Sequence, residues 1–296
     1  MYITQSGDTE IDIEFPTGFK RLEPYLGIAV NGEVEIDWGD NSTVSTVTGS
    51  SLTTQIRTQH IYSNTGKYTI TIHVVSGSFA FYGTSIYFLL SANNSSGDYN
   101  KVYSNLIKFI RIGNNCTIGS RAFYYCYSLE YITVPQEIYY SIGSYAFAYC
   151  YSLKYISLPK INNLSIGTNT FSSCCSLKNI SLPKSIGSIS SSSFSICNAL
   201  ESLIINFSGQ INAMYRGTSS SFTHTFFRLI VSKQKLKIIL KPYILDSELL
   251  NEQTSISSSL FGSCIILKEI IIPNTITSIE SYAFAYCQKL NVINIP

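Results

Sequence analysis

The chain has 296 residues, of which 45% are hydrophobic, so it has enough apolar side chains for two packed domains. Only 13% of the residues are charged and the formal net charge is +2, which excludes the broad basic surface that nucleic-acid binding requires. The most apolar run, residues 79–90, is too short to cross a bilayer as a helix, so we predict no membrane insertion.

Short strands dominate residues 1–78. Four runs have the composition of strands and cover residues 10–15, 34–38, 53–62 and 68–75. In the first, Ile11, Ile13 and Phe15 alternate with acidic residues, which is the period of a half-buried strand. Because this region has no helical pattern, we predict a small all-β sandwich.

Three segments of this region resemble the PKD-type immunoglobulin-like domain. They are VEIDWGD from Val34, HIY from His60 and GKYTITIHV from Gly66. Asn41 departs from the family pattern, which usually has glycine there. The resemblance implies an immunoglobulin-like sandwich that serves as a spacer or adhesive module of surface proteins and is not an enzyme.

Polar residues of the same region do not form a recognisable reaction centre. His60 has no serine or cysteine nucleophile paired with it by any motif, so we interpret it as a hydrogen-bonding structural histidine. Asp37 and Asp40 fall short of the six or more oxygen ligands that calcium prefers, and we predict no metal.

Residues 79–105 are predicted to be a bridge and an N-terminal cap. Residues 91–105 are rich in Ser, Asn and Gly and are typical of a loop. Residues 106–112 follow with the apolar spacing of a repeat strand. Together with residues 79–90, this opening strand is expected to cover the first coil of the repeats, because the end of a repeat stack otherwise exposes its core.

One pattern is written three times between residues 118 and 183. It reads IGSRAFYYCYSLEYITVP from Ile118, IGSYAFAYCYSLKYISLP from Ile142 and IGTNTFSSCCSLKNISLP from Ile166, so the copies start at equal intervals. Short-period internal repetition of this kind is typical of a solenoid, whose units bury their apolar faces against one another.

Within the second copy, the apolar positions predict one coil. Ala146, Phe147 and Cys150 have the i, i+3, i+4 spacing of one helical turn. Ile156 then begins a strand, which Pro159 ends because proline has no N–H to donate to a ladder.

These repeats resemble the BspA-like leucine-rich repeats of bacterial surface antigens. The resemblance rests on three features, which are the L-x-x-I-x-L core from Leu153, the preceding AFxxC block from Ala146 and the closing proline. The Asn or Cys that ordinary leucine-rich repeats have after the strand is missing. The resemblance implies a leucine-rich-repeat solenoid over residues 106–296, display at the cell surface, and binding to host matrix proteins or other cells.

The C-terminal part continues the pattern less regularly. A fourth repeat runs to Ile205, and two more occupy residues 256–273 and 279–296. The interval between the matching Leu200 and Leu267 corresponds to three periods, so we predict two degenerate coils within residues 207–255, with a strand at residues 237–240. Lys233, Lys235, Lys237 and Lys241 are expected to form a solvated basic face. Because the sequence stops directly on a strand, we expect either a longer natural chain or a partner that covers this coil. The partner could be a second copy of the chain, through end-to-end self-association.

The cysteines follow the repeat and not a metal-binding pattern. Cys126, Cys150, Cys174 and Cys197 occupy the same position of successive repeats, and Cys264 and Cys287 occupy it in the last two. No CxxC pair has Cys or His partners, so we predict a row of buried, reduced thiols and no zinc. Cys116 and Cys175 are the first candidates for disulfide bridges.

No catalytic motif is found, since a Gly-rich phosphate loop, an HExxH pair and a nucleophile elbow are all absent. We therefore predict no enzymatic activity and no cofactor.

The residues between the buried strand positions predict a contact surface. Phe109, Tyr131 and Tyr155 are expected to stand in one outward column, because they occupy the same repeat position. The candidate binding residues are Phe109, Arg111, Tyr131, Lys154, Tyr155, Lys178 and Asn179. The alternative is that the tyrosines only cover the strands.

The leading hypothesis is a non-enzymatic adhesion or recognition protein at the cell surface, with a sandwich followed by a solenoid. A structural stalk or fibre component of a larger assembly is the first alternative. A glycan-binding module, in which the same tyrosines stack on sugar rings, is the second.

Overall fold

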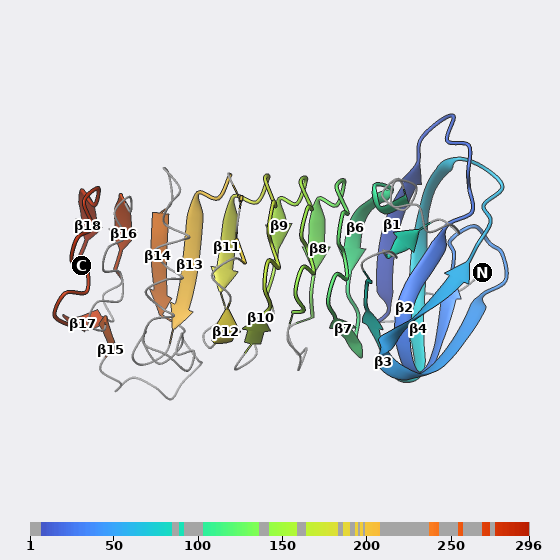
Figure 1. The fold of residues 1–296 in the computed structure, drawn as a ribbon, viewed down its shortest axis with the longest axis horizontal. Helices are drawn as coiled ribbons and strands as arrows, with labels where there is room; N and C mark the ends of the chain where they lie inside the picture. Colours follow the sequence, from blue (N-terminus) through green and yellow to red (C-terminus); the bar gives the residue numbers. More distant parts are fainter. Residues whose placement is uncertain are drawn as a thin grey trace.

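The computed structural model describes residues 7–84, 89–91, 103–135, 142–158, 164–182, 186–189, 193–194, 196–197, 199–207, 237–242, 254–256, 268–272 and 276–295. Its N-terminal sheet is followed by a row of coils that stack along one axis (Figure 1). Within these residues, no helix combines the length and the hydropathy that a membrane span requires.

Four strands build the N-terminal sheet, and each overlaps a strand predicted from the sequence. They are β1 (Thr9–Phe15), β2 (Tyr25–Asp37), β3 (Ser45–Gln59) and β4 (Gly66–Phe81). The strand order is β3-β2-β4-β1 and all three pairings are antiparallel. In β1, Ile11, Ile13 and Phe15 are buried while the residues between them are partly exposed, which confirms the predicted alternation.

The turn after β2 holds the side chains of the WGD and HxY segments together. The His60 ring stacks on Trp38 with ring centroids 4.7 Å apart, and His60 Nε2 lies 2.8 Å from Asp40 Oδ2. The Tyr62 hydroxyl donates a hydrogen bond of 3.0 Å to the Trp38 carbonyl oxygen. Asn41 has a φ of 63°, a left-handed conformation that glycine adopts without strain. His60 is thus a hydrogen-bonding histidine of a turn, as predicted.

Asp40 is held in its charged form by this turn. Burial raises its pKa, but hydrogen bonds from Ser42 and His60 outweigh burial and lower the pKa below the ordinary value.

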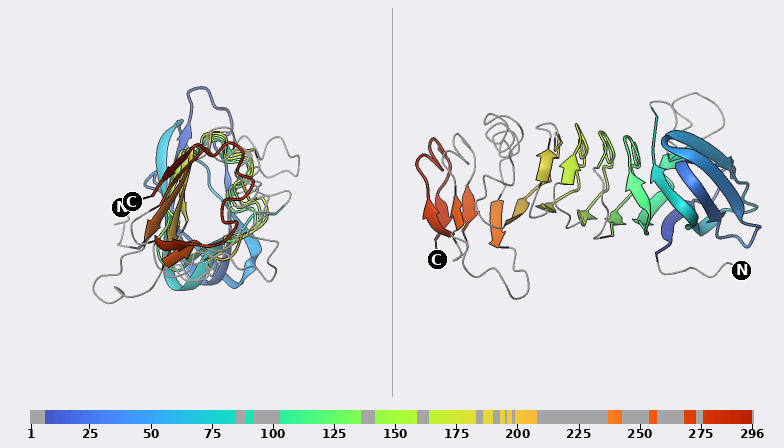
Figure 2. Two further views of the ribbon diagram at one scale, coloured as in Figure 1. Left: turned by 90° about the vertical axis from the view of Figure 1, so that its left-hand side faces the viewer. Right: turned by 90° about the horizontal axis from the view of Figure 1, so that it is seen from below.

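The repeat strands lie on two sides of the coils, which we call the first and second ladders, and within each ladder the strands that pair do so in parallel, in more than one sheet. The first ladder side contains β6 (Ile107–Arg111), β8 (Tyr131–Thr133), β9 (Tyr155–Ile156), β11 (Asn179–Leu182), β13 (Ser202–Phe207), β14 (Lys237–Pro242), β16 (Glu269–Ile271) and β18 (Val292–Asn294). The second contains β7 (Cys116–Ile118), β10 (Leu164–Ile166), β12 (Ile186–Ile189), β15 (Thr254–Ile256) and β17 (Ile276–Ile279). Viewed along the axis, successive coils superimpose around a common interior (Figure 2).

The N-terminal sheet continues into the repeats instead of forming the separate immunoglobulin-like sandwich predicted for residues 1–78. All described strands from β1 to β9, including β5 (Leu90–Ser91), belong to one hydrogen-bonded sheet. The reason is that the free edge of β1 pairs with β6, so that Glu10 lies opposite Arg111. The predicted boundary after residue 78 falls inside β4, whose residues Phe79–Phe81 pair with β7. This end of β4 therefore lies directly beside β7, the first strand of the second ladder.

The third side of each coil consists of turns, which corrects the predicted helical turn. Cys150 N donates to Phe147 O three residues earlier, as in a β-turn, and Tyr145 and Tyr149 have φ values of 59° and 64°. Other amides of this side bond to the next coil, since Phe147 N donates to Thr170 O at 2.8 Å. The backbone hydrogen bonds of this side therefore either close a turn or run to the next coil, and they do not form a helix.

Two rows of side chains fill the interior of the coils. Phe123, Phe147, Phe171 and Phe194 stack at centroid distances of 5.1, 5.3 and 5.3 Å. The Cys150 thiol donates to the carbonyl of a phenylalanine one coil earlier, with Cys150 Sγ 3.2 Å from Phe123 O. Cys174 and Cys197 repeat this bond to Phe147 and Phe171. The thiol therefore fills a small space and satisfies a buried carbonyl group.

The described cysteines confirm the predicted row of buried thiols. Cys126, Cys150, Cys174 and Cys197 are buried, and Cys287 is partly buried. Cys116 and Cys175 are free thiols in the structure. Cys264 lies outside the described residues.

We expect the buried row to resist alkylation in the folded protein. Burial raises the pKa of the Cys126, Cys150 and Cys174 thiols, so the reactive thiolate is scarce at mildly alkaline pH. Iodoacetamide should modify the partly exposed Cys175 first and the three buried thiols only after denaturation. Peptide mass mapping of folded and denatured samples measures this. Equal rates at Cys150 and Cys175 in the folded protein would contradict it.

Among the described residues of the irregular region, β14 is the strand that continues the first ladder, where two degenerate coils were predicted. β14 pairs directly with both β13 and β16, with Ser202 opposite Lys237 and Lys237 opposite Glu269. The first ladder therefore has one strand between β13 and β16, where three ordinary periods would give two. Lys237 and Lys241 lie in β14, whereas Lys233 and Lys235 lie outside the described residues.

Candidate functional site

The predicted column exists on the outer side of the first ladder, which we call the strand face. Phe109 pairs in register with Tyr131, and Tyr131 pairs with Tyr155. The neighbours Ile110, Ile132 and Ile156 point inward and are buried. Because side chains alternate along a strand, this burial turns the aromatic rings outward. Tyr131 and Tyr155 remain 43% and 52% exposed, so their rings are available for contact.

Charged side chains flank the column. Lys154 forms an ion pair with Glu130, and its Nζ lies 5.6 Å from the centre of the Tyr131 ring. The hydrogen bond from Lys154 to Glu130 raises the lysine pKa. Arg111 forms an ion pair with Glu10 and donates a hydrogen bond to its carboxylate. This hydrogen bond raises the pKa of Arg111.

The remaining predicted residues lie further along the face. Lys178 and Asn179 are both exposed, and Asn179 begins β11. Asn179 lies opposite Ser202 and accepts a hydrogen bond from its hydroxyl group. The strand face thus changes from aromatic near β8 to polar near β11.

The strand face extends onto the N-terminal sheet, which sequence reasoning missed. Asp12 lies opposite Phe109 on one side and Thr69 on the other, and directly opposed residues share one face of a sheet. The Thr69 hydroxyl donates to Asp12 Oδ1 at 2.7 Å. The outward surface therefore runs without interruption from β4 through β1 and β6 to β8.

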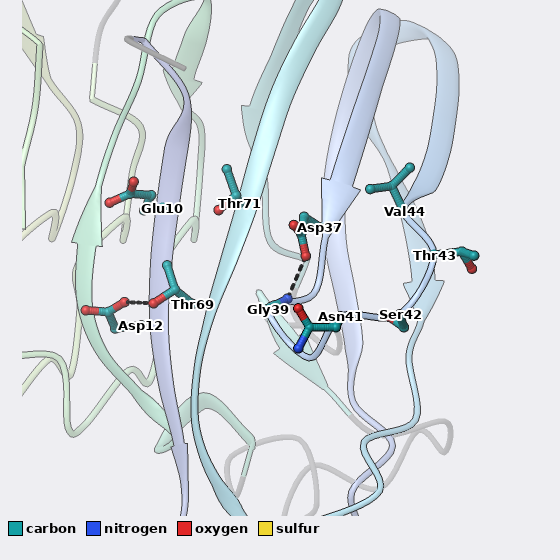
Figure 3. Close-up of a pocket in the computed structure, with 10 residues that line it drawn as sticks. All are labelled: Glu10, Asp12, Asp37, Gly39, Asn41, Ser42, Thr43, Val44, Thr69 and Thr71. Atoms are coloured by element: carbon teal, nitrogen blue, oxygen red, sulfur yellow. Dashed lines mark hydrogen bonds between the residues drawn. The ribbon is translucent and has the colours of Figure 1, made fainter. Parts of the chain in front are cut away.

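A hollow of about 940 Å³ lies at the N-terminal end of this face. Figure 3 shows Glu10 and Asp12 of β1 and Asp37 at the end of β2 along its walls. Asp37 Oδ1 accepts a hydrogen bond from Gly39 N at 2.8 Å, so this carboxylate stabilises the turn. Among the described residues, no group of three His, Cys, Asp or Glu side chains has the geometry of a metal site. The hollow gives the strand face a negative end beside the aromatic column.

A second exposed aromatic group lies on the turn side and was also not predicted. We call it the tyrosine cluster, and it consists of Tyr124, Tyr125, Tyr127, Tyr145, Tyr149 and Tyr151. Recurrence of tyrosine at the same repeat position, as in Tyr127 and Tyr151, is the sequence signal that could have revealed it.

The repeats match the model of the BspA type leucine-rich repeat region in six copies, over residues 116–239 and 243–296. This match covers more than half of the chain, which therefore belongs to the BspA-type leucine-rich repeat family. The match begins within β7, after the N-terminal strands.

Solved structures and curated sequences complete the comparison. The chain is 20% identical to a leucine-rich repeat protein of T. pallidum, covering 63% of this chain and 68% of that chain with a TM-score of 0.31. It is 17% identical to a leucine-rich cell surface protein of Faecalibacterium prausnitzii, covering 66% and 81% with a TM-score of 0.30. It is 19% identical to a leucine-rich repeat protein of Bacteroides ovatus, covering 65% and 73% with a TM-score of 0.25. No curated protein sequence matches the chain.

Proposed function

We propose that this chain is a non-enzymatic recognition protein of the cell surface that binds a partner protein of host matrix or other cells through its strand face. The observation that carries the proposal is the register of Phe109, Tyr131 and Tyr155, which aligns three aromatic rings on one outward surface. Tyrosine supplies a large contact area with few rotatable bonds, so ordering it at an interface costs little entropy. Membership of the BspA-type family supports a recognition role and surface display.

We also propose that the N-terminal strands are a PKD-like module adapted to the repeats. The contacts among Trp38, Asp40, His60 and Tyr62 support this, because two of the three characteristic segments of the sequence meet at one turn. In this proposal the module both caps the first coil and contributes the acidic end of the strand face.

The proposal predicts that Tyr131 and Tyr155 together dominate binding. A partner is first identified by screening immobilised matrix proteins and glycans with the whole chain. The double variant Tyr131→Ser, Tyr155→Ser should then weaken binding about 30-fold or more, since losing central aromatic contacts costs about 2 kcal/mol or more. Surface plasmon resonance measures the change.

A matched control is Tyr151→Ser, which removes a tyrosine of the same 43% exposure from the turn side. This variant should bind like the wild type. The strand face is excluded if the double variant binds normally. Binding to glycans alone would favour the glycan-binding alternative, and no binding to either class would favour a structural stalk.

A further inference from the structure

The tyrosine cluster brings phenol rings of consecutive coils into direct contact. Tyr127 and Tyr151 stack with ring centroids 4.9 Å apart and planes 5° from parallel. Tyr125 and Tyr149 stack beside them at 4.8 Å with planes inclined by 29°. Edge contacts connect the two stacks, with Tyr125 and Tyr127 centred 5.5 Å apart.

The outermost pair is also held together by its backbone. Ser152 N donates a hydrogen bond of 3.1 Å to Tyr127 O, so the two coils are joined next to the stacked rings. Tyr151 is 43% exposed and Tyr127 is partly exposed, so a soluble oxidant can reach both.

Both phenols are neutral at physiological pH. Burial, with a smaller contribution from the nearby Tyr151, raises the pKa of Tyr127 to about 12. Burial and the neighbouring Tyr149 also raise the pKa of Tyr151. No charge repulsion therefore separates the stacked rings.

We propose that Tyr127 and Tyr151 are a site of oxidative modification, at which a peroxidase with hydrogen peroxide joins the two rings as dityrosine. Each phenol loses one electron and its hydroxyl proton, and the two radicals form one carbon–carbon bond between ring positions ortho to the oxygens. Each joined carbon then loses its hydrogen as a proton while the oxygen of the same ring takes one up, which restores the aromatic rings and the hydroxyl groups without a net loss of protons in this step. Two electrons and two protons leave in total, and they reduce one hydrogen peroxide to two water molecules.

The product would be a covalent connection between the first two full repeats. It would link the coil of residues 118–135 to the coil of residues 142–158, which otherwise hold together through hydrogen bonds and packing. This modification is independent of the recognition role proposed for the strand face.

The test treats the dilute, folded whole chain with a plant peroxidase and hydrogen peroxide. Cleavage after Lys, Arg and Glu places Tyr127 in peptide 122–130 and Tyr151 in peptide 138–154. The expected product is a monomeric chain in which these two peptides are joined with the loss of two hydrogen atoms. Fragmentation by mass spectrometry then assigns the bond to Tyr127 and Tyr151.

Conservative variants and an internal control decide the assignment. Tyr127→Phe and Tyr151→Phe keep a stacking ring, so both should unfold like the wild type but lose the joined peptides. Tyr131 and Tyr155 are also register neighbours and comparably exposed, and their peptides 131–137 and 155–160 should remain unlinked. The proposal is overturned if the link persists in either variant, if only the control peptides are joined, or if all dityrosine lies between molecules.

Discussion

Replacing Phe147 with alanine is expected to lower the free energy of unfolding by about 4 kcal/mol, the usual cost of removing a fully buried phenylalanine. Phe147 is 0% exposed and stacks between Phe123 and Phe171 in the interior. Because the rings on both sides belong to neighbouring coils, the cavity would lie between backbones fixed by the ladders. The surroundings can then collapse only slightly, so the cavity left by the ring adds its full contribution to the cost.

Urea unfolding followed by circular dichroism measures this change. The matched control is Phe284→Ala, which occupies the same repeat position but is only partly buried. Its cost should be about half as large, because less apolar surface is lost. If the two variants lose the same free energy of unfolding, burial in the phenylalanine row does not stabilise the protein, and the expectation is wrong.

Replacing Gly143 with alanine is expected to cost about 3 kcal/mol, at the upper end for inserting an extra carbon into a packed interior. A Cβ atom at Gly143 would lie 2.3 Å from Gly119 C and from Ser120 N of the preceding coil. Gly167 has the same conflict with Ser144 N, at 2.5 Å. Backbone atoms cannot rotate away, so the coils must separate at the point where Gly143 N bonds to Ile118 O.

The melting temperature of Gly143→Ala, measured by calorimetry, tests this expectation. Thr168→Ala is a suitable control, since this exposed residue lies on the same turn side and should change stability by less than about 0.5 kcal/mol. A Gly143→Ala protein as stable as the control would mean that the coils are spaced more loosely than the structure indicates.

The repeated architecture could be predicted because each copy carries its own local pattern. The buried Phe147, Cys150 and Ile156 and the outward Tyr131 and Tyr155 follow from position within one repeat. Such positions require no knowledge of distant parts of the chain.

The turn side shows where a local pattern is ambiguous. Successive β-turns place Ala146, Phe147 and Cys150 inward with the same spacing as a helix. The β-turns differ from a helix in their hydrogen bonds to the next coil and in the left-handed conformation of Tyr145 and Tyr149. The spacing of hydrophobic residues predicts neither feature.

The junction between β1 and β6 and the position of β14 could not be predicted, because both depend on pairing over long sequence distances. Glu10 and Arg111 are 101 residues apart, and nothing in β1 alone specifies β6 as its neighbour. Likewise, the length of the interval from Leu200 to Leu267 does not determine how many strands of the first ladder it contains. The pairing of β14 with both β13 and β16 shows that one strand lies between those two. The acidic end of the strand face follows from that same junction.

The single sheet that joins β4, β1, β6 and β8 has a mechanical consequence. A pull along the stack axis would load the hydrogen bonds between strands in tension, because the strands lie across that axis (Figure 1). Each coil contacts mainly its neighbours, so extension would peel the protein one coil after another instead of rupturing it at once. The boundary between β1 and β6 is antiparallel, whereas the coils pair in parallel, but its hydrogen bonds also join neighbouring strands. Under tension it would separate as one more step of the same series.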